Sequence, residues 1–137
     1  MVSKDESEKS KLIAYLPHEE YMRLVAASDV GLIFLDHRFT IPNFPSRLLS
    51  YMEMRMPVLV VTDPNTDVGK VVEEGGFGYW CESNDVNQFI KLMRKMIDCD
   101  RKSMGERAYQ YLNDNYTSEK VYEIIIKHIE EKRNFNE

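Results

Sequence analysis

Residues 30–35 read Val-Gly-Leu-Ile-Phe-Leu, and residues 58–61 read Val-Leu-Val-Val. Neither run alternates with polar residues, which predicts strands that are buried on both faces of a parallel sheet. Between them, residues 46–54 have the spacing of a helix, and Pro57 ends it. A strand, a helix and a second strand in this order predict a parallel sheet with right-handed crossover connections.

The same alternation extends in both directions from this unit. Upstream, the apolar run 12–15 counts as a first strand stopped by Pro17, and a helix is expected at 19–27. Downstream, a short helix at 68–74 ends at Gly75-Gly76, and a fourth strand follows at 77–81. Asp85 is a candidate N-cap for a helix through residue 97, and further helices are expected at 101–113 and 118–132. The fold class is therefore α/β.

Length and composition limit the class of protein. The 137 residues fit one domain, with 1–11 as a polar N-terminal extension and 12–137 as the folded unit. With 18 Lys and Arg against 23 Asp and Glu and no basic block, nucleic acid is not an expected partner. No apolar run approaches the roughly 20 residues of a transmembrane helix, and the polar start is not a secretory signal. Two isolated cysteines, Cys81 and Cys99, indicate reduced thiols in the cytoplasm.

Several common catalytic motifs are absent from the sequence. It contains no GxGxxG dinucleotide fingerprint, no phosphate-binding GxxxxGK[ST], no HExxH and no GxSxG. The glycine-rich segment 75–78 fits a tight turn before a strand better than a nucleotide loop. His18, His37 and His128 lie far apart, so no metal site is expected.

The segment 42–52, Pro-Asn-Phe-Pro-Ser-Arg-Leu-Leu-Ser-Tyr-Met, is the candidate site. In parallel sheets, ligands bind at loops that leave the carboxyl ends of strands, and this loop follows the strand at 30–35. A helix start with free backbone N–H groups, the Ser46 hydroxyl and the Arg47 guanidinium would suit a phosphate. The alternative is ordinary capping by Pro45-Ser46 and a solvated Arg47.

This segment resembles part of a known enzyme family when its flanks are included. The matching stretches are 16–20 (Leu-Pro-His-Glu-Glu), 27–32 (Ala-Ser-Asp-Val-Gly-Leu), 44–52 (Phe-Pro-Ser-Arg-Leu-Leu-Ser-Tyr-Met), 56–59 (Met-Pro-Val-Leu) and 76–80 (Gly-Phe-Gly-Tyr-Trp), with Asp85. In this order and spacing they resemble the donor-binding domain of family 4 (group 1) glycosyltransferases, over residues of about 12–132. The likeness is greatest to the bacterial branch that builds capsule, O-antigen or exopolysaccharide.

The resemblance implies a GT-B architecture, in which two Rossmann-like domains face a cleft and the C-terminal one holds the nucleotide-sugar. This chain would be part of that C-terminal domain, a Rossmann-like parallel sheet with flanking helices that lacks its opening strands. The donor substrate would be a nucleotide-diphosphate sugar, without a metal or other cofactor. Catalytic residues are not identified by the resemblance.

Donor-site roles can be assigned by position from the same resemblance. Leu16 would lie against the nucleobase, Asn43 would be within reach of the sugar, and the entry formed by Phe44, Pro45, Ser46 and Arg47 would face the diphosphate. Ser50 stands where many relatives have a glutamate that binds the ribose, and Pro42 stands where they have that glutamate's partner near the donor sugar. Arg55 replaces the glycine that is usual two residues before Pro57.

The resemblance also implies partners that lie outside this chain. An N-terminal acceptor domain, in cis or in trans, would complete the cleft, and the acceptor would be a lipid-linked saccharide. This chain alone is expected to be inactive, as a fragment of a longer enzyme or one piece of a split one. Its location would be cytoplasmic, at the inner membrane face through the full-length enzyme. The alternatives are a non-catalytic nucleotide-binding or protein-interaction module of the same ancestry, or an unrelated flavodoxin-like signalling domain.

Other residues have both a ligand-binding and a structural interpretation. Asp63, Thr66 and Asp67 could bind sugar hydroxyls, but an Asx turn and a helix N-cap are preferred. Phe39 and Phe44 could stack on a ring, although packing of their loop is preferred. Trp80 is expected in the core. The apolar helix around 124–126 is expected to pack on the sheet or on another domain, since its polar side is mixed rather than basic.

Overall fold

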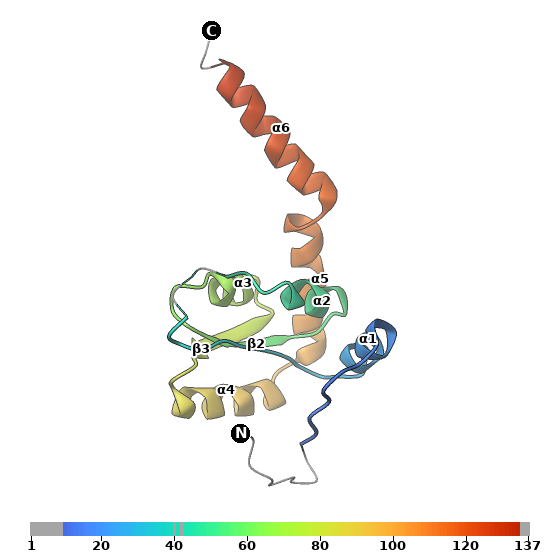
Figure 1. The fold of residues 1–137 in the computed structure, drawn as a ribbon, viewed down its shortest axis with the longest axis vertical. Helices are drawn as coiled ribbons and strands as arrows, with labels where there is room; N and C mark the ends of the chain where they lie inside the picture. The colour runs from blue at the N-terminus through green and yellow to red at the C-terminus, as the bar shows by residue number, and fades with distance from the viewer. Residues whose placement is uncertain (1–9, 40, 42, 135–137) are drawn as a thin grey trace.

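The computed structural model describes residues 10–39, 41 and 43–134. Its parallel sheet has the strand order β1-β2-β3, and Gly31, Val58 and Gly78 stand in register across it. This is the predicted α/β, Rossmann-like arrangement (Figure 1). The elements in chain order are α1 (His18–Ala26), β1 (Gly31–Phe34), α2 (Arg47–Glu53), β2 (Val58–Thr62), α3 (Val68–Glu74), β3 (Gly78–Glu82), α4 (Val86–Asp98), α5 (Arg101–Asn115) and α6 (Ser118–Asn134).

The central strand β2 separates two hydrophobic layers. Val58 and Val60 face the layer formed with α2 and α3, which includes Leu48 and Val72. The alternate residues of β2 face the α4 layer with Leu92. Figure 1 shows α2 and α3 on one side of the sheet and α4 on the other. Every residue of β2 is buried, so the prediction of a strand buried on both faces is confirmed there.

Local capping signals fix the starts of the later helices. The Asp85 carboxylate accepts a hydrogen bond from the Gln88 amide at 2.9 Å, which confirms the predicted N-cap of α4. Asp100 caps α5 in the same way through the Ser103 amide at 3.1 Å. At the other end of a helix, α3 is followed by Gly75-Gly76, and Gly76 has a φ of +64°. Glycine adopts that left-handed conformation without steric cost.

α5 connects the two layers. Met104 near its start belongs to the α4 layer, while Ala108, one turn later, belongs to the layer of α2 and α3. Gly105 lies directly against the backbone carbonyl of Arg55, the residue that leaves α2 with a φ of +52°. The absence of a side chain at Gly105 therefore allows α5 to approach the end of α2.

Two strand predictions are wrong. Residues 12–15 form no strand, and Leu12 and Tyr15 are 84% and 82% exposed. β1 is buried on one face only, since Leu32 and Phe34 are 40% and 55% exposed. α4 packs mainly on β2 and β3 and reaches that side of β1 through Phe89, whose ring centroid lies 6.0 Å from that of Phe34, so Leu32 and Phe34 are covered only in part. The exposed run at residues 12–15 buries too little apolar surface to be held as a strand.

The C-terminal helix α6 does not pack on the sheet, so that alternative for the segment around 124–126 is wrong. It extends away from the body of the molecule beyond α5 (Figure 1). Its large apolar side chains are exposed, among them Tyr122, Ile125 and Ile129, and only Ile126 is half-buried. Across residues 10–39, 41 and 43–134, no helix has the length and apolarity needed to span a membrane.

Candidate functional site

A hollow of about 400 Å³ opens at the carboxyl end of β1. One wall is the end of the strand, residues 33–35, and the other is the loop that enters α2. The residues that line it from this loop are Asn43, Phe44, Pro45, Ser46 and Arg47. The structure thus places these sequence-predicted donor-site residues around one open space at the strand-end edge where ligands of parallel sheets bind.

The entry to α2 differs from the sequence prediction. The helix begins at Arg47, and Ser46 has helical backbone angles but forms no side-chain cap bond. The amides of Leu48 and Leu49 already donate to the carbonyls of Pro45 and Ser46, at 3.0 and 3.1 Å. Two of the amides that were expected to be free in this first turn are therefore occupied. The Ser46 hydroxyl, which the capping interpretation would have used, is exposed beside the hollow.

Arg47 is exposed at the start of α2, and no carboxylate pairs with it within the described residues. It interacts with Tyr51, one turn along the helix. Burial raises the pKa of Tyr51, and the positive charge of Arg47 opposes that shift. The Tyr51 hydroxyl donates to the Leu32 carbonyl at 3.4 Å, which ties α2 to β1. Arg47 is therefore a cation held at the hollow without a neutralising acid.

Phe44 anchors the loop to α5. Its ring centroid lies 5.7 Å from that of Tyr116, and Tyr116 contacts Tyr111 at 6.1 Å. Burial raises the pKa of Tyr116. The predicted packing of this part of the loop is confirmed for Phe44, which fixes one wall of the hollow against the end of α5.

The remaining predicted residues lie elsewhere or are not described. Leu16 is half-buried ahead of α1, and Ser50 is half-buried within α2, and neither lines the hollow. Pro42 lies outside the described residues, as do residues 1–9 of the expected N-terminal extension. The nucleobase and ribose positions inferred for Leu16 and Ser50 therefore remain predictions.

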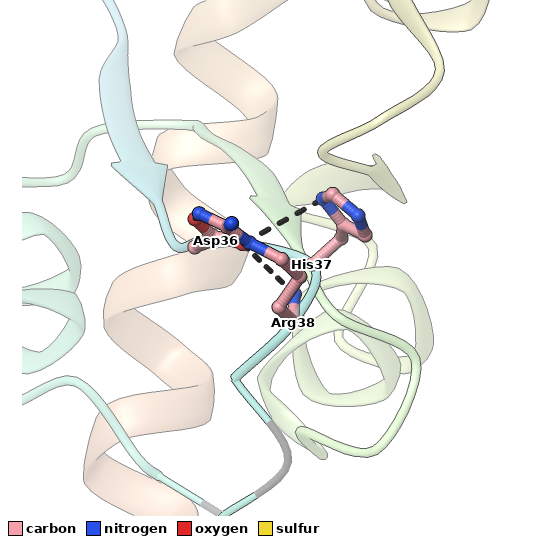
Figure 2. Close-up of polar contacts among 3 residues, drawn as sticks. All are labelled: Asp36, His37 and Arg38. Atoms are coloured by element: carbon pink, nitrogen blue, oxygen red, sulfur yellow. Dashed lines mark hydrogen bonds and ion pairs between the residues drawn. The ribbon is translucent and has the colours of Figure 1, made fainter.

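Asp36, His37 and Arg38 form a polar cluster directly after β1, which sequence reasoning did not identify (Figure 2). The Arg38 guanidinium donates from Nε to Asp36 Oδ1 at 2.9 Å and from Nη2 to Oδ2 at 2.6 Å. These bonds, with one from the Arg38 amide, hold the pKa of the Asp36 carboxyl well below its usual range. His37 Nδ1 lies 3.6 Å from the same carboxylate. The available signal was an Asp-x-Arg sequence at a strand end, which is common in turns.

A match to known proteins covers most of this chain. The family described as "Glycosyl transferases group 1" matches residues 3–111. The chain belongs to the group 1 glycosyltransferases. A relative from Pseudomonas aeruginosa, described as "Probable glycosyltransferase WbjE", is 26% identical over 113 residues, which cover 82% of this chain and 28% of the relative. The chain thus spans less than a third of that relative's length. No solved structure matches it.

The resemblance implies a glycine where Arg55 stands. Arg55 has a positive φ of +52°, a conformation that glycine adopts easily. Its guanidinium lies 3.9 Å from the Tyr109 ring centroid and pairs with Glu106 at 3.2 Å. These contacts with α5 compensate part of the backbone strain, and they agree with the predicted exposed cation at a helix end.

The second strand-end loop of the glycosyltransferase chain is structural. Asp63 is fully buried and accepts hydrogen bonds from the amides of Asn65 and Thr66 and from the Thr66 hydroxyl, at 2.8, 3.0 and 2.7 Å. Those bonds, the hydroxyl's first, lower the pKa of Asp63. The preferred Asx turn is confirmed, but Asp67 makes no cap bond and pairs with Lys70 instead. Trp80 packs on the core and donates to the Thr62 hydroxyl at 3.0 Å, as predicted.

Proposed function

We propose that this chain contributes the donor-binding part of a glycosyltransferase, with the diphosphate of a nucleotide-activated sugar held in the hollow between β1 and the entry to α2. The observation that carries the proposal is Arg47, which has no carboxylate partner among the described residues and lies beside the exposed Ser46 at the carboxyl end of a parallel strand. Membership in the group 1 glycosyltransferases supports glycosyl transfer. The hollow's size admits a diphosphate and part of a sugar.

The chemistry assigned to these residues is stabilisation of the leaving group. In glycosyl transfer, the bond between the anomeric carbon and the diphosphate oxygen breaks, and a bond to an acceptor hydroxyl forms as that hydroxyl loses its proton. Negative charge therefore grows on the departing diphosphate. A guanidinium and a hydroxyl placed at that oxygen strengthen their hydrogen bonds as the charge develops. Arg47 and Ser46 are the residues proposed for this role.

The proposal also concerns the longer glycosyltransferase to which this chain would contribute its donor-binding part. Donor and acceptor must be aligned in one cleft, and positioning supplies much of the rate. We assign the acceptor side to a separate acceptor domain, so this chain would bind donor without transferring sugar. The proposed product is a capsule, O-antigen or exopolysaccharide, built on a lipid-linked saccharide at the cytoplasmic face. The segments 44–52 and 56–59, which resemble that bacterial branch, support this assignment.

A ligand titration tests the proposal. Backbone NMR shifts of the chain are followed with UDP, GDP and their hexose conjugates, and the titrations are repeated with Arg47→Ala. Shifts are expected at residues 33–35 and 43–47, and loss of a charge-assisted contact should weaken binding about tenfold or more. Arg94→Ala, which removes an exposed arginine of α4, is the matched control and should bind as the unaltered chain does.

Three outcomes would count against donor binding at the hollow. Shifts confined to residues that do not line the hollow would show that the diphosphate is not held there. Binding that is unchanged in Arg47→Ala would show that this cation does not hold the diphosphate. No shifts at millimolar ligand would favour the interaction-module alternative, for which the exposed apolar side chains of α6 would supply a surface.

A further inference from the structure

The C-terminal helix α6 presents an exposed apolar stripe along its length. Tyr122, Ile125 and Ile129 follow one another at spacings of three and four residues, which places them on one side of the helix. Val121 lies beside them, and each of these four side chains is about half exposed or more. Because α6 extends away from the body of the molecule (Figure 1), the stripe is open to contact along most of the helix.

The helix has little to stabilise it within this chain. The Lys120 amide donates to the Thr117 hydroxyl at 3.2 Å and caps its start. From residue 118 to residue 133, however, no side chain is fully buried. Most of the stability of a helix in a protein comes from packing of its apolar face, and a helix of 17 residues is marginal without it. The exposed stripe therefore indicates a surface that packs against another polypeptide.

The charges beside the stripe show which polypeptide fits it. Glu119 lies in the first turn of α6 and Arg133 in the last, and neither forms an ion pair among the described residues. They are separated by about four helical turns, so both lie along the same edge of the stripe. When two α6 helices pair in antiparallel orientation, opposite ends of that edge meet, and Glu119 of each helix faces Arg133 of the other. In the same pairing Tyr122 faces Ile129.

We propose that α6 pairs in antiparallel orientation with α6 of a second copy of this chain. The contact is two-fold symmetric, with the same stripe on both sides. Because α6 extends away from the body, the two bodies lie at opposite ends of the helix pair, which separates two chains that each carry a net charge of −5. A single helix pair is smaller than a standard interface, so the dissociation constant is expected in the micromolar range. No residue of α6 lines the hollow at β1, so the inference does not depend on donor binding.

Sedimentation equilibrium of the full chain across a dilution series measures the dissociation constant of the dimer. Ile125→Lys places a charge at the centre of the stripe and should weaken dimerisation about thirtyfold or more. Glu131→Gln changes the net charge by the same amount on the polar side of α6 and is the matched control. Its dissociation constant should stay within about twofold of that of the unaltered chain.

Charge reversal tests the antiparallel orientation. Glu119→Lys and Arg133→Glu each place like charges opposite one another at both ends of the helix pair, and each should weaken dimerisation about fivefold or more. The two substitutions combined in one chain restore opposite charges, so the dissociation constant should return to within about twofold. A loss of α6 helix would behave differently, because both reversals oppose the helix dipole and their effects would add.

Three results would overturn the inference. A chain that stays monomeric at every concentration up to about 1 mM would assign the stripe to a different polypeptide. A dimer whose dissociation constant is unchanged in Ile125→Lys would form through another surface. Losses that add in the combined charge reversal would exclude the antiparallel contact. An unchanged backbone NMR spectrum over residues 31–115 verifies the fold of each variant.

Discussion

The buried Asp63 carboxylate should make the free energy of unfolding depend on pH. Its carboxylate is fully buried and accepts three hydrogen bonds from Asn65 and Thr66. Replacing it in Asp63→Ala leaves those donors without a buried acceptor and should cost about 2 kcal/mol of unfolding free energy at neutral pH. Urea unfolding measures this loss. Asp67→Ala, which removes an exposed carboxylate paired with Lys70, is the control and should change stability by less than about 0.5 kcal/mol.

The sign of the pH effect follows from the lowered pKa of Asp63 in the folded protein. The ionised form is favoured by folding, so its contribution is complete above the ordinary value of 3.8 and is lost as the pH falls through the folded value. The stability difference between the unaltered chain and Asp63→Ala should therefore shrink in acid. A difference that stays constant from pH 7 down to pH 3 would contradict the assignment.

Gly105 tests the contact between α5 and the end of α2. A Cβ at this position would meet the Arg55 carbonyl, which is backbone and cannot turn aside. Gly105→Ala should therefore destabilise the protein by about 3 kcal/mol, the upper range for overpacking. In Gly76→Ala the neighbour is the flexible Arg107 side chain, and the cost is the left-handed φ, about 1–2 kcal/mol. Thermal and urea unfolding should rank the two variants in that order, and the reverse ranking would show that α5 can move.

At the scale of elements, two residues at helix starts behave differently. Asp85 caps α4 through the Gln88 amide, so Asp85→Ala should cost about 1 kcal/mol. Ser46 makes no cap bond at the start of α2, so Ser46→Ala should cost less than about 0.5 kcal/mol. Urea midpoints measure both effects. A loss for Ser46→Ala as large as that for Asp85→Ala would restore the capping interpretation of Ser46 and weaken its proposed role as a ligand.

Helices and strands were predictable where the residues that determine them lie within the element or next to its ends. Asp85 and Gly75-Gly76 mark helix ends through bonds and conformations that involve only neighbouring residues, and the helices at α3 and α4 were placed within a residue. The apolar run 12–15 failed because a strand also needs a partner and a cover, which its own residues cannot supply. The exposure of Leu32 and Phe34 could likewise not be predicted from the residues of β1, because it depends on where α4 lies.

The residues of the candidate site also differ in how far the sequence alone could predict them. Asn43 to Arg47 were predicted as a group because they are contiguous and follow a strand, and chain continuity alone brings them to one hollow. Leu16 was assigned only through the family resemblance, and the structure does not place it at that hollow. The Asp36–Arg38 pair was missed because a side-chain orientation between residues two apart leaves no periodic pattern in the sequence.

The arrangement of β2 between two layers predicts that the molecule unfolds as one unit. Val60 and Val61 are adjacent in β2 but face opposite layers, and they pair with Trp80 and Cys81 of β3. Exposing one layer removes one face of both strands, which should destabilise the other layer. Trp80, the chain's single tryptophan, reports on the α2 and α3 side, and the buried Cys81 thiol, whose pKa is raised by burial, reports on the α4 side.

The measurement compares these two reporters in Cys99→Ser, where Cys81 is the remaining thiol. Trp80 fluorescence and the extent of brief thiol-reagent labelling at Cys81 are followed through the same urea series. Coincident midpoints are expected, because a two-state domain loses both layers together. Labelling of Cys81 at lower urea than the fluorescence change would mean that α4 opens separately. In that case the α4 layer would be the less stable half, while the layer that holds α2 and the hollow would stay folded.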